Sequence, residues 1–261
     1  MPADVSAVVV TLDARPWIER CLDSVRSHET IVVDVGSTDG TPELVRGRFP
    51  DAQLVEIENR GLAAGWNEGI RRASGRYVLI LNADAWMLDD AIEKLAAFAD
   101  AHPEAAVVAP RSSALNAFYA GGFEHDTVRE AEFVMGAVML VRREAINVVG
   151  PLDEDFFLFS EETDWHYRFE RAGWKVFFTP DAEAVHVGGA SHGGRFFVEQ
   201  ITGHLRFLAK HRGLREAERA RRLLLVALRL RGAAFRGERG RIYREAAARL
   251  ASGPVRELLR R

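Results

Sequence analysis

Residues 31–40 read IVVDVGSTDG, an apolar run that ends in an acid and continues into a turn of Gly, Ser, Thr and Asp. Short runs rich in Val and Ile are typical of buried strands, and Thr41-Pro42-Glu43 is typical of a helix start. In open α/β sheets, ligands bind outside the carboxyl ends of the strands. The stretch predicts a strand, a ligand-facing Asp34 and a helix, although Asp34 would equally suit a turn closed by its own side chain.

The same alternation of strand and helix extends over the first half of the chain. Strands are expected at 6–12, 30–35, 52–57 and 77–81, and helices at 16–28, from 41, at 62–73 and at 89–101. Beyond residue 107 the segments shorten to a glycine loop at 121–122, strands at 133–141, 174–179 and 184–187, and a helix at 160–172. We therefore predict an α/β domain with a mostly parallel central sheet flanked by helices.

Charge divides the chain into two regions. Residues 203–261 contain 17 Lys and Arg against 5 Asp and Glu, a net charge of +12, whereas residues 1–202 contain 18 against 33, a net charge of −15. We expect a catalytic domain over 1–202 and a basic helical extension over 203–261, with helix breaks at Gly213, Gly232, Gly237, Gly240 and Pro254.

The extension has two interpretations. Its interleaved Leu and Arg suit peripheral docking on an anionic membrane, and they suit equally a helical bundle that packs its Leu face on the domain and leaves an Arg face in solvent. Nucleic-acid binding is disfavoured because Phe207, Phe235 and Tyr243 are too widely spaced to form a stacking surface.

The remaining composition indicates the compartment. Cys21 is the only cysteine, which excludes an internal disulfide framework and a cysteine-built zinc site. The first residues show no basic segment followed by a long apolar run, and no run of about 18 apolar residues exists for a membrane span. We expect a cytoplasmic protein, or one held peripherally on the inner face of the cell membrane.

Two further strand ends carry candidate metal ligands. Residues 79–84 end in Asn82 and Asp84, and Mg²⁺ or Mn²⁺ prefers carboxylate together with phosphate oxygens. A lone Asp after a strand is also a common helix cap. His186 ends the segment 184–187 before the glycine pair 188–189, and a neutral imidazole is a good additional ligand for Mn²⁺ or an ordinary structural residue.

Three acids, Glu161, Glu162 and Asp164, lie at an expected helix start after the apolar residues 156–159. The helix dipole favours the ionised form that a general base needs, whereas apolar neighbours raise the pKa. Glu161 and Asp164 share a helix face, and Glu162 lies about 100° around it, so the three cannot all enter one pocket. Alternatively, the acids only complement the dipole of a solvated helix.

Taken in order, these segments resemble the inverting family-2 glycosyltransferases, especially the rhamnosyltransferase-like branch of bacterial cell-wall and polysaccharide biosynthesis. The resemblance extends over roughly residues 5–192. The matching segments are 8–11, 21–25, 33–40, 59–61, 65–69, 81–84, 135–137, 150–154, 161–164, 173–174 and 186–189. Each segment is weak alone, and the fixed order of so many makes a chance match improbable.

The resemblance implies a single glycosyltransferase A-type domain that binds a nucleotide-sugar donor, with rhamnose as the first guess for the sugar. It places Asp34 on the base or ribose, Thr11 and Ser37 in the nucleotide pocket, and Asn67, Asn82 and Asp84 near the donor. Asp84 and His186 would hold Mn²⁺ or Mg²⁺. The family's base falls on Glu162, with Glu161 and Asp164 as the other candidates, and the acceptor would be a saccharide or polyprenyl-linked saccharide. A homodimer is a further expectation.

Several positions depart from the family pattern. Glu162 stands where Asp is commoner, Asn82 where an acid often begins the metal motif, and Val35, Trp66 and Ala83 replace frequent Asn, Asn and Pro. Two alternatives follow. A nucleotidyltransferase would need a basic glycine-rich loop near the N-terminus, which residues 11–15 are not, and a catalytically inactive nucleotide-sugar-binding scaffold is allowed by the changed acids.

Overall fold

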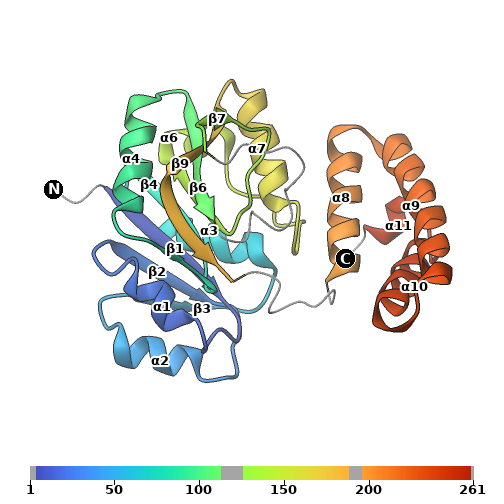
Figure 1. Ribbon diagram of the computed structural model, residues 1–261, viewed down its shortest axis with the longest axis horizontal. Helices are drawn as coiled ribbons and strands as arrows, with labels where there is room; N and C mark the ends of the chain where they lie inside the picture. The colour runs from blue at the N-terminus through green and yellow to red at the C-terminus, as the bar shows by residue number, and fades with distance from the viewer. Residues whose placement is uncertain (1–3, 113–125, 188–195, 260–261) are drawn as a thin grey trace. The chain divides into compact units, whose positions relative to one another are not determined.

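A computed structural model of the chain describes residues 4–112, 126–187 and 196–259 (Figure 1). The described chain forms two compact units. The first contains residues 4–154 and 162–187 within those ranges, and the second contains 155–161 and 196–259. The boundary after residue 202 stays a prediction, and residue 202 lies inside helix α8 (Phe197–His211).

The first unit is built on one mixed sheet. The described strands are β1 Val5–Thr11, β2 Glu29–Asp34, β3 Gln53–Glu56, β4 Tyr77–Asn82, β5 Ala85–Met87, β6 Ala105–Ser112, β7 Arg129–Glu130, β8 Val138–Arg142 and β9 Lys175–His186. Their order is β3-β2-β1-β4-β8-β6-β9-β5, and β7 pairs with β9. The ladders from β3 to β4 are parallel, whereas β8 runs antiparallel to both of its neighbours. The predicted α/β class is confirmed.

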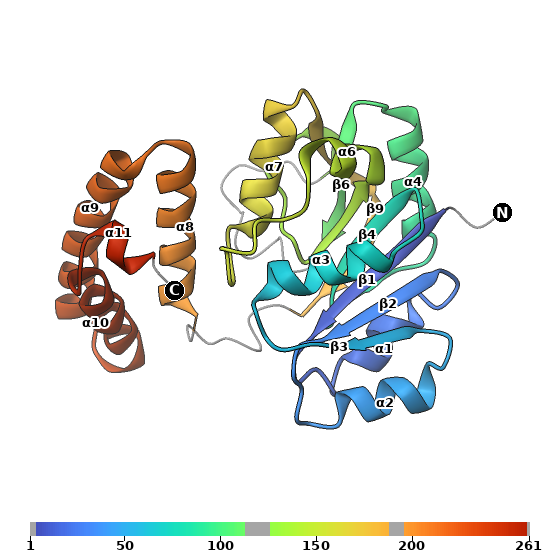
Figure 2. The same ribbon diagram turned by 180° about the vertical axis from the view of Figure 1, so that it is seen from behind.

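Helices cover both faces of this sheet, as Figures 1 and 2 show. Helices α1 Ile18–Asp23, α2 Thr41–Arg48 and α4 Ala91–Ala101 contribute to one apolar core, and α3 Leu62–Arg72, α6 Arg143–Val149 and α7 Glu161–Arg171 contribute to the other. Helix α3 lies very close to β1. A Cβ at Gly65 would be 2.8 Å from Val10 Cγ1, and one at Gly69 would collide with Val8, which explains both glycines of the segment 65–69.

Several elements differ from the prediction. The helix expected at 16–28 is helical only at Ile18–Asp23, and the strand expected at 133–141 begins at Val138. The two strands expected at 174–179 and 184–187 are one strand, β9, in which the pairing with β6 jumps from Thr179 to Glu183. Pro180 has no N–H to donate, so the predicted break is present as an irregularity inside a continuous strand. Strands β5, β6 and β7 were not predicted.

The second unit consists of α8, α9 Leu214–Ala234, α10 Gly237–Ala251 and α11 Val255–Leu258. These helices pack around a leucine cluster of their own that includes Leu205, Leu228 and Leu250. The predicted packing of the Leu face on the catalytic domain stays a prediction. Gly232 and Gly240 do not break helices. Their missing side chains allow close contacts, since a Cβ at Gly232 would lie 2.9 Å from Arg244 Cγ and one at Gly240 would collide with the Phe235 carbonyl. None of the described helices has both the length and the apolar character that a membrane span requires.

Candidate functional site

Three predicted site residues meet at the carboxyl edge of the sheet. Strands β1, β2 and β4 end at Thr11, Asp34 and Asn82. Thr11 is directly paired with Asp34, and Val10 is paired with Asn82, so the three ends are adjacent. The parallel register therefore gathers side chains that lie far apart in the sequence at the edge where α/β proteins bind ligands.

Asp34 has two different carboxylate oxygens. Its Oδ1 accepts the N–H groups of Gly36 and Ser37 at 3.0 and 2.9 Å, which is the self-closed turn of the structural interpretation. Its Oδ2 is buried and has no hydrogen-bond partner among the described residues, and the same holds for Thr11 Oγ1. Buried oxygens without partners are costly. This pair is suited to a ligand that brings its own N–H or O–H groups.

The turn after β2 is fastened to the turn after β1 by reciprocal hydrogen bonds. Ser37 Oγ accepts the N–H of Asp13 at 2.8 Å, and Asp13 Oδ1 accepts the N–H of Thr38 at 2.7 Å. Asp39 Oδ2 accepts the N–H of Arg15 at 2.9 Å. Burial raises the pKa of Asp39, but its hydrogen bonds from Thr41 and Arg15 outweigh that effect and leave the pKa below the usual value. Ser37, which was predicted to bind the nucleotide-sugar donor, thus joins the two turns. Its hydroxyl acts as an acceptor there, so its proton is available for a hydrogen bond to a ligand.

The two predicted metal ligands lie together. Asp84 Oδ1 is 3.3 Å from His186 Nε2, and both side chains are only partly exposed. The short strand β5 brings the two residues together, because it pairs antiparallel with β9 and sets Ala85 opposite His186. The Val187 N–H also donates a hydrogen bond to the Asp84 carbonyl at 3.1 Å. Residues 188–189, the predicted glycine approach to a diphosphate, lie outside the described residues, as does the glycine loop at 121–122.

One carboxylate and one imidazole form an oxygen and nitrogen donor set that fits Mn²⁺. Within the described ranges no cluster of three or more His, Cys, Asp or Glu side chains could hold a metal without help, so oxygens of a bound ligand would have to complete the shell. Cys21 lies near this turn, where its thiol donates to the Asn82 carbonyl at 3.6 Å. Burial, and then the Asp84 charge, raises the pKa of this thiol, so Cys21 supports the turn as a neutral group.

The three candidate acids of α7 have different surroundings. Asp164 is fully buried and accepts a hydrogen bond from Arg168 Nε at 2.8 Å. The same guanidinium donates to the carbonyls of Val149 and Pro151, so this ion pair fastens α7 to the end of α6. Glu161 is buried as well, whereas Glu162 is half-buried.

Glu162 lies beside residues 136–137, which contact the end of β4. A Cβ at Gly136 would lie 3.4 Å from Glu162 Cβ and 2.7 Å from Trp66 Cη2, so only glycine fits between these two side chains. The next residue, Ala137, accepts the Asn82 N–H at 2.8 Å. Glu162 is therefore connected through residues 136–137 to the strand end that leads into Asp84.

Asn67 is engaged inside the first unit. Its Nδ2 donates to the Leu152 carbonyl at 2.9 Å and to Glu154 Oε1 at 3.1 Å, and its Oδ1 accepts the Leu152 N–H at 3.0 Å. The amide therefore positions the segment after α6. A direct contact between Asn67 and a donor stays a prediction.

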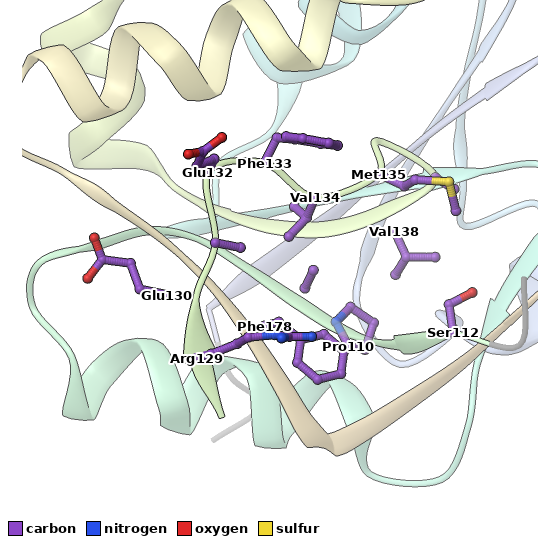
Figure 3. A pocket seen from close by; sticks show the side chains of 13 residues that line it. Pro110, Ser112, Arg129, Glu130, Glu132, Phe133, Val134, Met135, Val138 and Phe178 are labelled. Atoms are coloured by element: carbon purple, nitrogen blue, oxygen red, sulfur yellow. The ribbon is translucent and has the colours of Figure 1, made fainter. Parts of the chain in front are cut away.

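A hollow of about 290 Å³ lies at the same edge and was missed in the sequence (Figure 3). Its walls are mainly apolar and include Pro110, Phe133, Met135 and Phe178, and the lining residues with polar side chains are Ser112, Arg129, Glu130 and Glu132. Ser112 is paired with Ala184, two residues before His186, and its buried hydroxyl has no partner among the described residues. An apolar hollow with few polar groups is typical of a small-molecule site. Two of its lining residues, Met135 and Ala137, lie in the segment 135–137 that the family resemblance had singled out.

Comparisons with known proteins identify the family and the fold. The profile of glycosyl transferase family 2 matches residues 6–146. The N-acetylglucosaminyl-diphospho-decaprenol L-rhamnosyltransferase of Mycobacterium tuberculosis is 25% identical, over 69% of this chain and 74% of the relative. Two solved structures share the fold. A mannosyltransferase from Pyrobaculum calidifontis, in complex with GDP-Man and Mn²⁺, has a TM-score of 0.65 and 22% identity, over 99% of this chain and 85% of its own. TarS of S. aureus with UDP-GlcNAc has a TM-score of 0.58 and 18% identity, over 78% and 66%.

Proposed function

The chain belongs to glycosyl transferase family 2 and is a glycosyltransferase, and we propose from this premise that it transfers a sugar from a nucleotide diphosphate donor with inversion. The proposed acceptor is a hydroxyl of a saccharide or lipid-linked saccharide, which the name of the mycobacterial relative supports. The observation that carries the proposal is the Asp84–His186 pair, 3.3 Å apart, at the sheet edge that also holds Thr11 and Asp34.

The nucleoside is assigned to the β1 and β2 ends. Asp34 Oδ2 and Thr11 Oγ1 would accept hydrogen bonds from a base N–H or a ribose hydroxyl, which would supply the partners that both buried oxygens lack among the described residues. The interlocked turns at 13–15 and 37–39 keep these acceptors in place without a conformational change. Asp84 and His186 would hold the Mn²⁺ or Mg²⁺ ion, which neutralises charge on the leaving diphosphate when it is bound.

Glu162 is the proposed general base. It would take the proton from the acceptor hydroxyl as that oxygen attacks the anomeric carbon, on the face opposite the departing nucleoside diphosphate. The new bond forms as the bond from carbon to diphosphate oxygen breaks, so the configuration inverts. The ion pair of Asp164 with Arg168 argues against Asp164 in this role.

The hollow of Figure 3 supports rhamnose as the first proposal for the sugar. It extends from Met135, next to Gly136 and Glu162, to Ser112, near His186 along the sheet. Rhamnose is a 6-deoxyhexose, so it carries a methyl group where most hexoses carry a hydroxymethyl group. The apolar part of the walls, formed by Pro110, Phe133, Met135 and Phe178, would favour the methyl group because it offers no partner to the extra hydroxyl.

The test is a thermal-shift panel of UDP-, GDP- and dTDP-sugars, with and without Mn²⁺ or Mg²⁺, followed by transfer assays with the donors that bind. A ligand that binds the folded state raises the melting temperature. We expect a selective, metal-enhanced shift that dTDP-rhamnose gives more strongly than dTDP-glucose. Asp84→Asn should lose the metal enhancement, and the exposed-site control Asp51→Asn should keep it.

Other outcomes would redirect the proposal. A shift that is equal with and without metal would remove Asp84 and His186 from the metal role. Release of pyrophosphate would indicate nucleotidyl transfer, and donor binding with no turnover on any acceptor or water would indicate an inactive scaffold. A cytoplasmic location and a homodimer stay predictions.

A further inference from the structure

Helix α9 carries a second apolar surface, besides the one it buries in the bundle. Its buried face includes Ala217, Leu228 and Gly232. Three large aliphatic side chains on the other face are more than half exposed, Leu223 at 74%, Val226 at 57% and Leu230 at 68%. Their spacing of three and four residues places them in one row, which we call the α9 stripe.

Arginines flank the α9 stripe on both sides. At about 100° per residue, Arg222 and Arg229 lie along one border and Arg231 along the other. All three are exposed, and Arg229 makes no ion pair with any described residue. From residue 223 to residue 234 the helix contains no acid. The nearest acid in α9 itself, Glu218, is bound by Arg221 and Arg222, and hydrogen bonds, chiefly from Arg221, lower the pKa of Glu218 to about 2.

We propose that the α9 stripe docks this protein on an anionic lipid bilayer, with Leu223, Val226 and Leu230 in the interface and the flanking arginines at the headgroups. An apolar row bordered by basic residues is the pattern of helices that lie in the plane of a membrane surface. The net charge of +12 over residues 203–261 adds long-range attraction to an anionic surface.

A second copy of the chain fits this surface less well. Two α9 helices meeting through the same stripe would bring Arg222, Arg229 and Arg231 of one copy near the same arginines of the other. Like charges brought together at an interface oppose association. Anionic headgroups complement these arginines instead.

Docking through the α9 stripe does not depend on the sugar chemistry, and only its benefit to the enzyme rests on the proposed function. An enzyme whose acceptor is attached to a lipid gains from a surface that holds it where the acceptor is. Binding to vesicles can be measured without donor, metal or acceptor. Failure of docking and failure of glycosyl transfer are therefore separate results.

The experiment is cosedimentation of the full chain with vesicles of phosphatidylglycerol or of phosphatidylcholine, at low and high salt. We expect binding to phosphatidylglycerol at low salt, at least tenfold weaker binding to phosphatidylcholine, and release by high salt. The double variant Leu223→Gln/Leu230→Gln should bind phosphatidylglycerol at least tenfold less and should keep the wild-type melting temperature. Val148→Gln, an exposed aliphatic site on α6 in the first unit, is the matched control and should bind as wild type.

Charge is tested with a second matched pair. Arg229→Gln should weaken binding several-fold, whereas Arg256→Gln, an exposed arginine on α11 with no ion pair to the described residues, should have a smaller effect. Absence of wild-type binding at low salt, or equal binding by the double variant, would overturn the proposal. So would light scattering that shows a wild-type dimer and a monomeric double variant, because the α9 stripe would then be an interface between copies.

Discussion

At the end of β2, Asp34 accepts hydrogen bonds from the N–H groups of Gly36 and Ser37, two and three residues further along the chain. At the start of α7, the surroundings of Glu162 come from Gly136 and Trp66, and the Asp164–Arg168 pair binds carbonyls at the end of α6. The first side of the site is built from local contacts, and the second from contacts between distant segments. The sequence therefore predicts the local contacts of Asp34 well, and it does not distinguish among the three neighbouring acids at the start of α7.

The largest expected effect comes from Glu162→Gln. If Glu162 is the base, transfer should fall by roughly 10²–10⁴-fold, since this is the usual contribution of general acid–base catalysis. The thermal shift with donor should persist, because the nucleoside side of the site is untouched. Glu170→Gln, at the exposed far end of α7, is the matched control. Full activity in Glu162→Gln would move the base to Glu161 or Asp164.

Asp164→Asn should lower the stability of the fold more than it lowers transfer activity. Removing one partner of a buried ion pair leaves the other without compensation, so we expect a loss of about 3 kcal/mol in the free energy of unfolding. Urea unfolding measures this loss, and transfer per folded molecule should stay within a few-fold of wild type. If instead activity disappears while stability is unchanged, the distinction between Asp164 and Glu162 drawn from the Arg168 contacts is wrong.

His166 gives α7 a pH-dependent stability. It is fully buried, and burial lowers its pKa from 6.5 to about 3. The unfolded chain therefore binds the proton first as the pH falls below 6.5, and stability that is complete above this value is lost down to about pH 3. Between pH 8 and pH 5 this one residue should cost roughly 2 kcal/mol.

The measurement is urea unfolding of wild type and His166→Leu across that pH range. The variant lacks the titrating group, so the difference in unfolding free energy between the two proteins should change with pH by that amount. Parallel pH profiles would mean that His166 is protonated in the folded state or reaches solvent.

The smallest expected effect concerns Asp34 at the end of β2, where the contacts are local. Asp34→Asn keeps an oxygen to accept the hydrogen bonds of the turn. It replaces Oδ2, the proposed acceptor for the nucleoside, by an amide group that can only donate. We expect a KM for the donor about tenfold higher with little change in kcat, as for the loss of one hydrogen bond made equally in ground and transition states. Asp51→Asn is again the control. A fall in kcat with unchanged KM would place Asp34 at the reacting atoms.

Most of the first half of the fold was predictable because its signals are local. The apolar runs of β1, β2 and β4 and the turn residues after Asp34 each specify their own element. Strand β5 was not predictable in this way. It is three residues long, and its only reason to be a strand is its pairing with β9. Gly232 and Gly240 misled for a similar reason, since they serve helix packing and do not end the helices.

The sequence by itself determined the fold class, the family resemblance, and the acids and histidine that stand at the ends of strands and helices. Periodicity and turn chemistry operate within a few residues, so these features can be read along the chain. Only the tertiary structure decided which of these side chains meet. The β5–β9 ladder sets Asp84 beside His186, the α6–α7 contact engages Asp164, and the bundle leaves the α9 stripe exposed. Each depends on pairing or packing between distant segments, which no local pattern specifies.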